Sequence, residues 1–309
     1  MILVLLLLLL SMQTSLENVF FDPEECQCGL ETVRMKMING KAVNIPSKPW
    51  NTQFGRTDSF PRFQDRCEGT LISDRHVLTT ARCAKPFEGK EYDLNFVVGQ
   101  EERVNVFLYQ KHKQVIDIKI HPEFDENKLG NDIAILELKY KLTFSHGFCP
   151  ICLPDFDSTE DKLFSYRFEP SKMKGNKNKR KIQTKIIKEV ELTRISPEFC
   201  ETFFKPKVLN TTLTMCTLNE EQDHDVLTQQ DLGKALSTRI DGREYQVGIT
   251  SLIHPKTKKV FPNGFERILP HLNWIRDNTK NGVFCYGHHH PFFLKPTQVL
   301  DAMDDKWFY

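Results

Sequence analysis

The sequence lacks a dominant charge, a second long apolar run and any internal repeat. Its 309 residues carry 42 lysines and arginines against 41 aspartates and glutamates. This balance argues against a strongly basic nucleic-acid-binding protein, and a hydrophobic fraction of 39% argues against wholesale disorder. After residue 10 no apolar run approaches the roughly twenty residues that a membrane-spanning helix needs, so we expect no membrane span.

The N-terminus is the one long apolar stretch. Residues 1–10 are continuously apolar and are followed by the small polar residues Ser11 and Ser15. Such a run is too short to cross a bilayer, so it predicts a signal peptide over residues 1–15 and a secreted, extracellular protein. A buried N-terminal strand is the alternative. Nine cysteines agree with export, because disulfides persist in oxidising compartments, and an odd number leaves one thiol unpaired.

Short apolar runs separated by Gly, Pro, Asn and Asp continue from about residue 38 to residue 268. β-branched runs of about four to eight residues are typical of strands, so the pattern predicts an all-β barrel or sandwich. The clearest runs are Thr70–Ile72, Val77–Thr79, Phe96–Val98, Val115–Ile120, Asp132–Leu136 and Tyr245–Ile249. Helical spacing is clearest over residues 269–280, where Leu272 and Ile275 follow Pro270, and it predicts a closing helix.

Two segments depart from this pattern. Between Lys172 and Lys188 lie eight basic residues and no acidic one, including Lys177, Lys179, Arg180 and Lys181. This basic segment predicts binding of an anionic glycan or an acidic protein, and a solvated surface loop is the alternative. The tail over residues 279–309 has no periodicity and is expected to be partly disordered. Its three histidines, 288–290, offer a metal site or a feature of the tail, and we assign no metal or cofactor.

Four segments carry a family resemblance. Residues 67–83 contain Cys-Glu-Gly-Thr-Leu-Ile-Ser and Val-Leu-Thr-Thr-Ala-Arg-Cys, and they resemble the surroundings of the catalytic histidine in trypsin-like (chymotrypsin-family) serine proteases. Residues 121–138, with Asn-Asp-Ile-Ala-Ile-Leu, resemble the strand that carries the family's catalytic aspartate. Pro150–Pro154 and Asn273–Ile275 match in the same order. The resemblance implies two six-stranded antiparallel β-barrels with a C-terminal helix over residues 37–278, preceded by a propeptide-like segment at 16–36.

The resemblance places Arg82, Asp132 and Leu232 at the three catalytic positions. A serine protease needs a base and a nucleophile, but an arginine stays protonated at neutral pH and a leucine has no nucleophilic atom. Gln230 stands where a glycine shapes the family's oxyanion hole. The positions of the specificity pocket are matched by Val226, Ile253 and Asn263, with Asp225 at the first of them in a register shifted by one residue.

These departures predict an inactive homologue that acts as a binding or regulatory module. The expected partner is a protein, namely an active protease, an inhibitor or a substrate. His76 and Ser237 are near Arg82 and Leu232 in sequence, but in the resembled fold they face other surroundings. The alternatives are an endopeptidase with unconventional catalytic residues and a divergent product without a selected role.

The resemblance also implies a zymogen switch. In the family, the aspartate matched by Asp231 receives a new N-terminal ammonium after a cut that here would fall between Lys36 and Met37. The alternative is that Asp231 is a remnant held by local hydrogen bonds. We further expect Arg82 to pair with Asp132 and to lower the pKa of that carboxyl.

Three disulfides follow from the resemblance, namely Cys67–Cys83, Cys200–Cys216 and Cys28–Cys152. Any two of the remaining Cys26, Cys149 and Cys285 are able to pair. A zinc site built from cysteines 26, 28, 149 and 152 is an alternative from counting alone. Asn210-Thr211-Thr212 is a glycosylation sequon and implies surface exposure if it is used.

Overall fold

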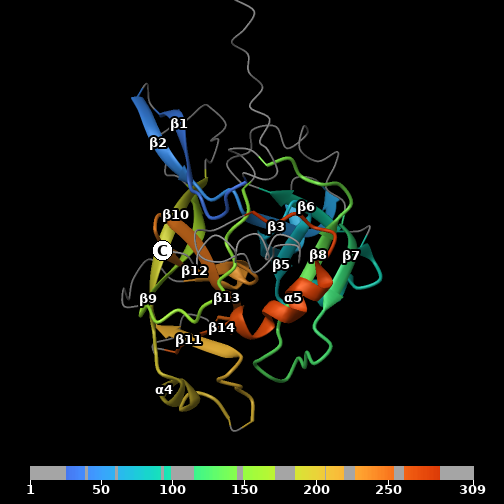
Figure 1. The fold of residues 1–309 in the computed structure, drawn as a ribbon, viewed down its shortest axis with the longest axis vertical. Coiled ribbons are helices and arrows are strands. Elements are labelled where there is room, and N and C mark those ends of the chain that lie inside the picture. The colour runs from blue at the N-terminus through green and yellow to red at the C-terminus, as the bar shows by residue number, and fades with distance from the viewer. Residues whose placement is uncertain are drawn as a thin grey trace, which may run out of the picture.

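The computed structural model describes residues 26–38, 41–59, 62–91, 94–98, 115–144, 149–170, 185–205, 207–218, 227–253 and 261–285. Nearly all regular structure in these ranges is β and forms two six-stranded units and a hairpin (Figure 1). The described residues contain no helix with the length and apolar character to cross a membrane. The prediction of an all-β fold with a C-terminal helix is confirmed.

The first unit is an antiparallel sheet with the strand order β6–β3–β4–β5–β8–β7. Its strands are β3 (Asn51–Ser59), β4 (Arg62–Leu71), β5 (His76–Thr79), β6 (Leu94–Val98), β7 (Val115–Ile120) and β8 (Ala134–Leu138). Within the described residues β6 and β7 are the two edges of this sheet, and no described strand pairing joins them. Residues 99–114, which connect the two edges, lie outside the described residues.

The second unit is a closed barrel with the strand order β10–β11–β14–β13–β12–β9. Its strands are β9 (Lys162–Pro170), β10 (Lys185–Arg194), β11 (Thr214–Leu218), β12 (Ala235–Ile240), β13 (Arg243–Leu252) and β14 (Asn263–Arg267). The β12–β13 and β13–β14 pairs each contain a register shift, and local breaks in a ladder of this kind help strands bend as closure of a small barrel requires. The predicted second barrel is therefore present.

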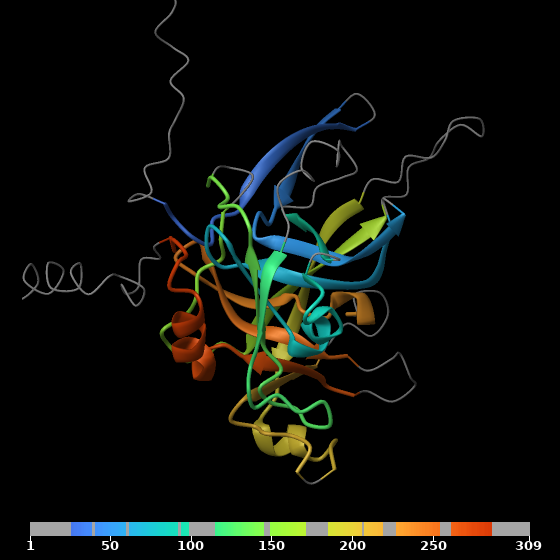
Figure 2. The ribbon, with the colours of Figure 1, turned by 90° about the vertical axis from the view of Figure 1, so that its right-hand side faces the viewer.

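Short helices and one hairpin complete the fold. They are α2 (Ala81–Ala84), η1 (Lys85–Phe87), α4 (Pro197–Glu201), η4 (Gln229–Asp231), η5 (Leu269–His271) and α5 (Leu272–Asn278), with β1 (Thr32–Ile38) paired to β2 (Lys41–Ser47). The β1–β2 hairpin projects away from the two units in both views (Figures 1 and 2). Leu272 and Ile275 of α5 are buried in the first unit's core, so the predicted closing helix covers that core.

Each unit has its own apolar core. The larger core lies in the first unit and includes Trp50, Phe54 and Leu136, whereas the barrel core includes Leu192 and Phe265. Leu232 is half-buried and packs against both cores. The segment that contains the expected nucleophile position therefore lies at the junction of the two units.

Candidate functional site

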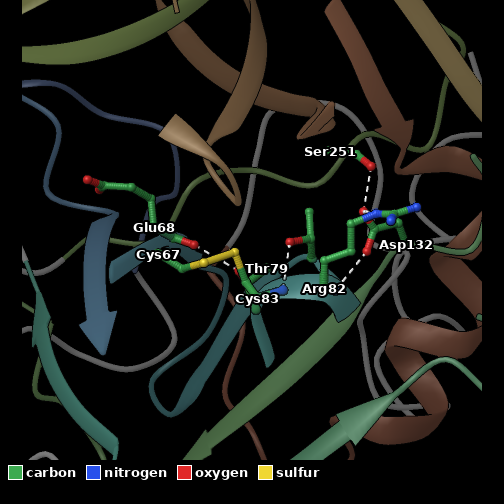
Figure 3. The surroundings of a disulfide bond; sticks show 8 residues. Cys67, Glu68, Thr79, Arg82, Cys83, Asp132 and Ser251 are labelled. Atoms are coloured by element: carbon green, nitrogen blue, oxygen red, sulfur yellow. Dashed lines mark hydrogen bonds and ion pairs between the residues drawn. A yellow bond between two sulfur atoms is a disulfide. The ribbon is translucent and has the colours of Figure 1, made fainter. Parts of the chain in front are cut away.

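Arg82 is held in place by local structure on both sides. β5 ends at Thr79, and the side chain of Thr80 caps the short helix α2 by accepting a hydrogen bond from Cys83 N at 3.3 Å. The Cys67–Cys83 disulfide ties α2 to β4 (Figure 3). The sequence therefore places the backbone of Arg82 on a rigid support directly after a buried strand.

Arg82 and Asp132 form the predicted pair. The backbone N–H of Arg82 donates to Asp132 Oδ1 at 2.9 Å, and Arg82 Nε donates to Oδ2 at 3.0 Å. Ser251 of β13 adds a third donor, since its hydroxyl lies 2.5 Å from Oδ2 (Figure 3). The side chain of Asp132 is 0% exposed, so this carboxyl group is enclosed by both units of the fold.

The rest of the Arg82 guanidinium points outward and is also engaged. Nη1 donates to the carbonyl of Glu126 at 2.7 Å and Nη2 to the carbonyl of Lys128 at 2.6 Å. The guanidinium carbon lies 5.6 Å from the ring centroid of Phe124, within cation–π range. Arg82 therefore joins the Asp132 carboxyl to the loop that precedes Asp132 in the sequence. A guanidinium has no lone pair with which to accept a proton, so Arg82 does not act as a base.

The pKa of Asp132 departs from our expectation. We predicted that Arg82 lowers it, but burial raises the pKa of this carboxyl above its usual range, despite the donors from Ser251 and Arg82. The prediction of the pair is confirmed and the predicted direction of the pKa shift is wrong. The reason is that removal from water disfavours the charged form more than these donors favour it.

Leu232 stands at the nucleophile's position with no reactive atom. It follows η4, and its carbonyl accepts a hydrogen bond from Glu68 N at 2.9 Å. Gly233 comes next with φ of 86°, and a Cβ there would lie 2.0 Å from the carbonyl oxygen of Glu68. Gly233 is needed because β4 approaches this turn so closely. The side chain of Leu232 packs against the two cores.

Two of the three specificity-pocket positions lie within the described residues. Ile253 and Asn263 are both buried, and Ile253 packs in the barrel core with Leu227. The side-chain amide of Gln229 donates to the carbonyl of Ile253 at 2.5 Å, which links η4 to the end of β13. Val226 lies outside the described residues. Sequence reasoning did not identify Gln229.

Asp231 is buried with partners on both carboxyl oxygens. Lys234 Nζ donates to Oδ1 at 2.5 Å, while Oδ2 accepts from the backbone N–H of Thr228 at 2.7 Å and from its hydroxyl at 2.9 Å. The side chains of Lys234 and Asp231 are only 4% and 6% exposed. Lys234 was missed from the sequence, although a lysine in place of the last glycine of the family's Gly-Asp-Ser-Gly-Gly was the available signal.

The other residues of the expected zymogen switch lie in the hairpin. Lys36 and Met37 belong to β1 and pair with Val43 and Ala42 of β2. Residues 26–31 are held elsewhere on the molecule. Gly29 N donates to the carbonyl of Pro150, and the carbonyl of Gly29 accepts from Glu244 N. Arg243 Nη1 donates to the carbonyl of Cys28 at 2.9 Å. The structure does not bring Lys36 and Met37 into any described contact with Asp231.

The three disulfides implied by the resemblance are present, and they are joined by Cys26–Cys285. Cys149 is the free thiol among the described residues, and its S–H donates to the carbonyl of Gln27 at 3.1 Å. The zinc alternative is wrong because three of its four cysteines are oxidised. Residues up to Cys285 pack on the body, where Val283 N donates to Asp74 Oδ1 at 2.8 Å.

Two further residues raised by the sequence belong to separate networks. His76 Nδ1 lies 2.8 Å from the hydroxyl of Ser73, and burial, with the charges of Lys119 and Arg75, lowers the pKa of His76 to about 4. Ser237 donates to Glu244 Oε2 at 3.1 Å in the barrel. Neither residue has a described contact with Asp132, so neither takes the place of a missing catalytic group there.

Several predicted features lie outside the described residues. These are the signal peptide at 1–15, the basic segment with Lys177, Lys179, Arg180 and Lys181, and the three histidines at 288–290. They remain predictions. Among the residues that the structure describes, no three His, Cys, Asp or Glu side chains come together in a way that suits a metal ion.

Comparisons with known proteins agree with this geometry. Residues 37–275 match the family model described as Trypsin, which spans both units and most of α5. Venom serine protease of Polistes dominula is 23% identical over 273 residues, which cover 85% of this chain and 91% of that protein. CLIP domain-containing serine protease B4 of Anopheles gambiae is 24% identical over 271 residues, or 83% of this chain and 73% of that protein. Tissue-type plasminogen activator of Bos taurus is 29% identical over 289 residues, or 84% of this chain and 48% of that protein.

Proposed function

This chain belongs to the trypsin family of serine proteases, and on that basis we propose that it is a secreted, catalytically inactive member that binds or regulates a protein partner. Its partner is an active protease, an inhibitor or a protein substrate of that family. In this role the fold is a rigid support for recognition of the partner, without catalysis.

The geometry of Arg82 carries this proposal. Three of its side-chain nitrogens donate to fixed acceptors, and none of them is able to take a proton from a nucleophile. Leu232 supplies no hydroxyl or thiol on the opposite side. Loss of the nucleophile or of the base lowers kcat by about 10⁶-fold in a triad enzyme. With both groups replaced, the site has no route to acyl transfer through this pair.

The surroundings of the pair support the same conclusion. Gln229 engages the carbonyl of Ile253, and Ile253 itself is buried in the barrel core. Asp231 already has a cation, Lys234, within the fold. These contacts stabilise one arrangement of the segment from Gln229 to Lys234, and in that arrangement Ile253 and Asp231 are already engaged by groups of the protein itself.

Four disulfides support the proposed location. Disulfides form and persist in oxidising compartments and are rare in the cytosol. The apolar N-terminal run of residues 1–10 points to the same secretory route.

A serine-directed fluorophosphonate probe tests the proposed inactivity. We expect no labelling of the purified chain under conditions in which an active trypsin reacts fully. Labelling of this chain would support the alternative, an endopeptidase with unconventional residues. Ser251 is the hydroxyl that contacts Asp132, so a Ser251→Ala variant would show whether such labelling arises at the site.

The binding role is tested separately. The purified chain is titrated by calorimetry against an active trypsin-family protease, a protein inhibitor of such proteases and a protein substrate. We expect saturable heat with at least one of the three. Absence of binding to all three would contradict the proposed class of partner, whatever the outcome of the labelling experiment.

A further inference from the structure

The loop before β11 presents the side chain of Asn210 at the surface. Asn210 and Thr212 are exposed, and Thr211 between them is half-buried. The order Asn-Thr-Thr satisfies the acceptor pattern for N-linked glycosylation, because the middle residue is not proline. Exposure and sequence therefore agree at the same three residues.

The side chains of Asn210 and Thr212 form a local turn within this loop. The Oδ1 atom of Asn210 accepts the backbone N–H of Thr212 at 3.1 Å and the Thr212 hydroxyl at 2.6 Å. In the described part of the chain, no acceptor is hydrogen-bonded to the Nδ2 atom of Asn210. The oxygen is held inside the turn, so the nucleophilic nitrogen is the atom left to the solvent.

The same loop is fixed to its neighbours by backbone and side-chain contacts. Asn210 N donates to the carbonyl of Leu129 at 3.0 Å, and Leu129 N donates to the carbonyl of Val208 at 2.7 Å. Arg267 of β14 donates to the carbonyl of Thr212 at 2.9 Å through Nη1 and to that of Leu213 at 2.7 Å through its backbone N–H. The backbone at the attachment point, Asn210, is therefore held at a defined position.

We propose that Asn210 carries an N-linked oligosaccharide. In the transfer, Nδ2 of Asn210 forms a bond to the anomeric carbon of a lipid-pyrophosphate-linked oligosaccharide. The bond from that carbon to the pyrophosphate oxygen breaks, the lipid pyrophosphate leaves and the amide releases one proton. Thr212 supplies the hydroxyl residue of the acceptor pattern, and in the folded chain its hydroxyl donates to Asn210 Oδ1.

The position of Asn210 gives the glycan a structural consequence. A Cβ built on Gly130 would lie 3.2 Å from the Cβ of Asn210, so the two loops are in direct contact. Arg82 donates to the carbonyls of Glu126 and Lys128 in the loop that leads to Gly130. The attachment point of the glycan therefore lies beside this loop, and we expect the first sugars to shield the loop from solvent.

Site occupancy is measured by mass spectrometry of chain secreted from mammalian cells, with residues 1–15 replaced by an established secretion leader. Entry into the pathway then does not depend on the secreted location proposed above. We expect the wild type to carry a glycan that peptide N-glycosidase removes with conversion of Asn210 to aspartate. Asn210→Gln and Thr212→Ala abolish it, whereas Thr211→Ala and Thr212→Ser retain it because they keep the acceptor pattern.

Secreted wild type with its four disulfides formed and an unmodified Asn210 would overturn the proposal. The covering of the loop is tested by comparing glycosylated wild type with its enzymatically deglycosylated form, which has aspartate at position 210, for cutting by a glutamyl endopeptidase at Glu123 and Glu126. We expect removal of the glycan to raise the rate several-fold. Equal rates would overturn the covering of this loop.

Discussion

Two buried carboxyl groups in this protein each have a cation beside them, and the two pairs differ in how they meet solvent. Asp132 pairs with Arg82, whose side chain is 31% exposed and extends to the carbonyls of Glu126 and Lys128. Asp231 pairs with Lys234, and both side chains are almost fully buried. One pair joins a buried carboxyl to a surface loop, whereas the other closes a turn inside the molecule.

This difference indicates different roles. Asp132 also receives hydrogen bonds from Ser251 and from the backbone of Arg82, so it keeps two donors without the guanidinium. If Lys234 is lost, the described partners that remain for the Asp231 carboxyl are the backbone N–H and the hydroxyl of Thr228. Neither carries a positive charge, whereas Lys234 does. A buried ion pair costs most when one partner is removed, because an uncompensated charge remains.

Replacement of Lys234 is expected to have the largest effect. Lys234→Met removes the ammonium and leaves the Asp231 carboxyl buried, which we expect to lower the free energy of unfolding by about 3–5 kcal/mol. The measurement is urea unfolding, with a shift of the midpoint at unchanged slope.

The matched control for Lys234→Met is the double variant Asp231→Asn with Lys234→Met. Removal of both charges is expected to recover most of the lost stability, because no buried charge stays unpaired. A single variant that loses less than about 1 kcal/mol would contradict the importance of the Lys234–Asp231 pair.

The second-largest effect is expected from acid, because a third buried group, His76, becomes protonated when the chain unfolds at low pH. The pKa of folded His76 is lowered to about 4, against about 6.5 in the unfolded chain, so the fold favours neutral His76. Its contribution is complete above about pH 6.5 and is lost as the pH falls toward 4, by about 3 kcal/mol at the lower limit.

The variant His76→Gln tests this assignment, since it should flatten the decrease of stability between pH 6.5 and 4. An unchanged slope in that variant would mean that other groups control stability in this pH range. The acid dependence of the two ion pairs is then measured in the His76→Gln background.

Replacement of Arg82 is expected to have a smaller effect than replacement of Lys234. Arg82→Ala removes the guanidinium but keeps the backbone donor and Ser251, so we expect a loss of about 1–3 kcal/mol in the free energy of unfolding. Arg82→Met, which retains the apolar stem, separates lost packing from lost hydrogen bonds. A loss equal to that of Lys234→Met would remove the distinction between the two pairs.

Cleavage after Lys36 is expected to have the smallest effect. A new terminus at Met37 finds both oxygens of Asp231 already engaged, so the melting temperature should stay unchanged after limited trypsin treatment. N-terminal sequencing identifies the cut, and Lys36→Gln is the resistant control. A rise in melting temperature that depends on Lys36 would show that the new terminus displaces Lys234.

Parts of the site were predictable because they depend on short segments. The strand Val77–Thr79 and the cysteines 67 and 83 identify the support of Arg82, and the structure confirms them. The pairing of Cys26 with Cys285 was left open, because cysteines that lie 259 residues apart in sequence have no local signal that joins them. The contact of Lys234 with Asp231 was not predicted, because a motif comparison shows that a residue is replaced but not which atom the new side chain contacts.

The amino-acid sequence by itself determined which chemical groups stand at the key positions. A guanidinium at position 82 has no lone pair and a leucine at position 232 has no hydroxyl, and neither fact depends on geometry. Only the tertiary structure decided that burial raises the pKa of Asp132 and that Lys234 neutralises Asp231. Desolvation and ion pairing depend on distances set by the packing of both six-stranded units, which no single segment of the chain contains.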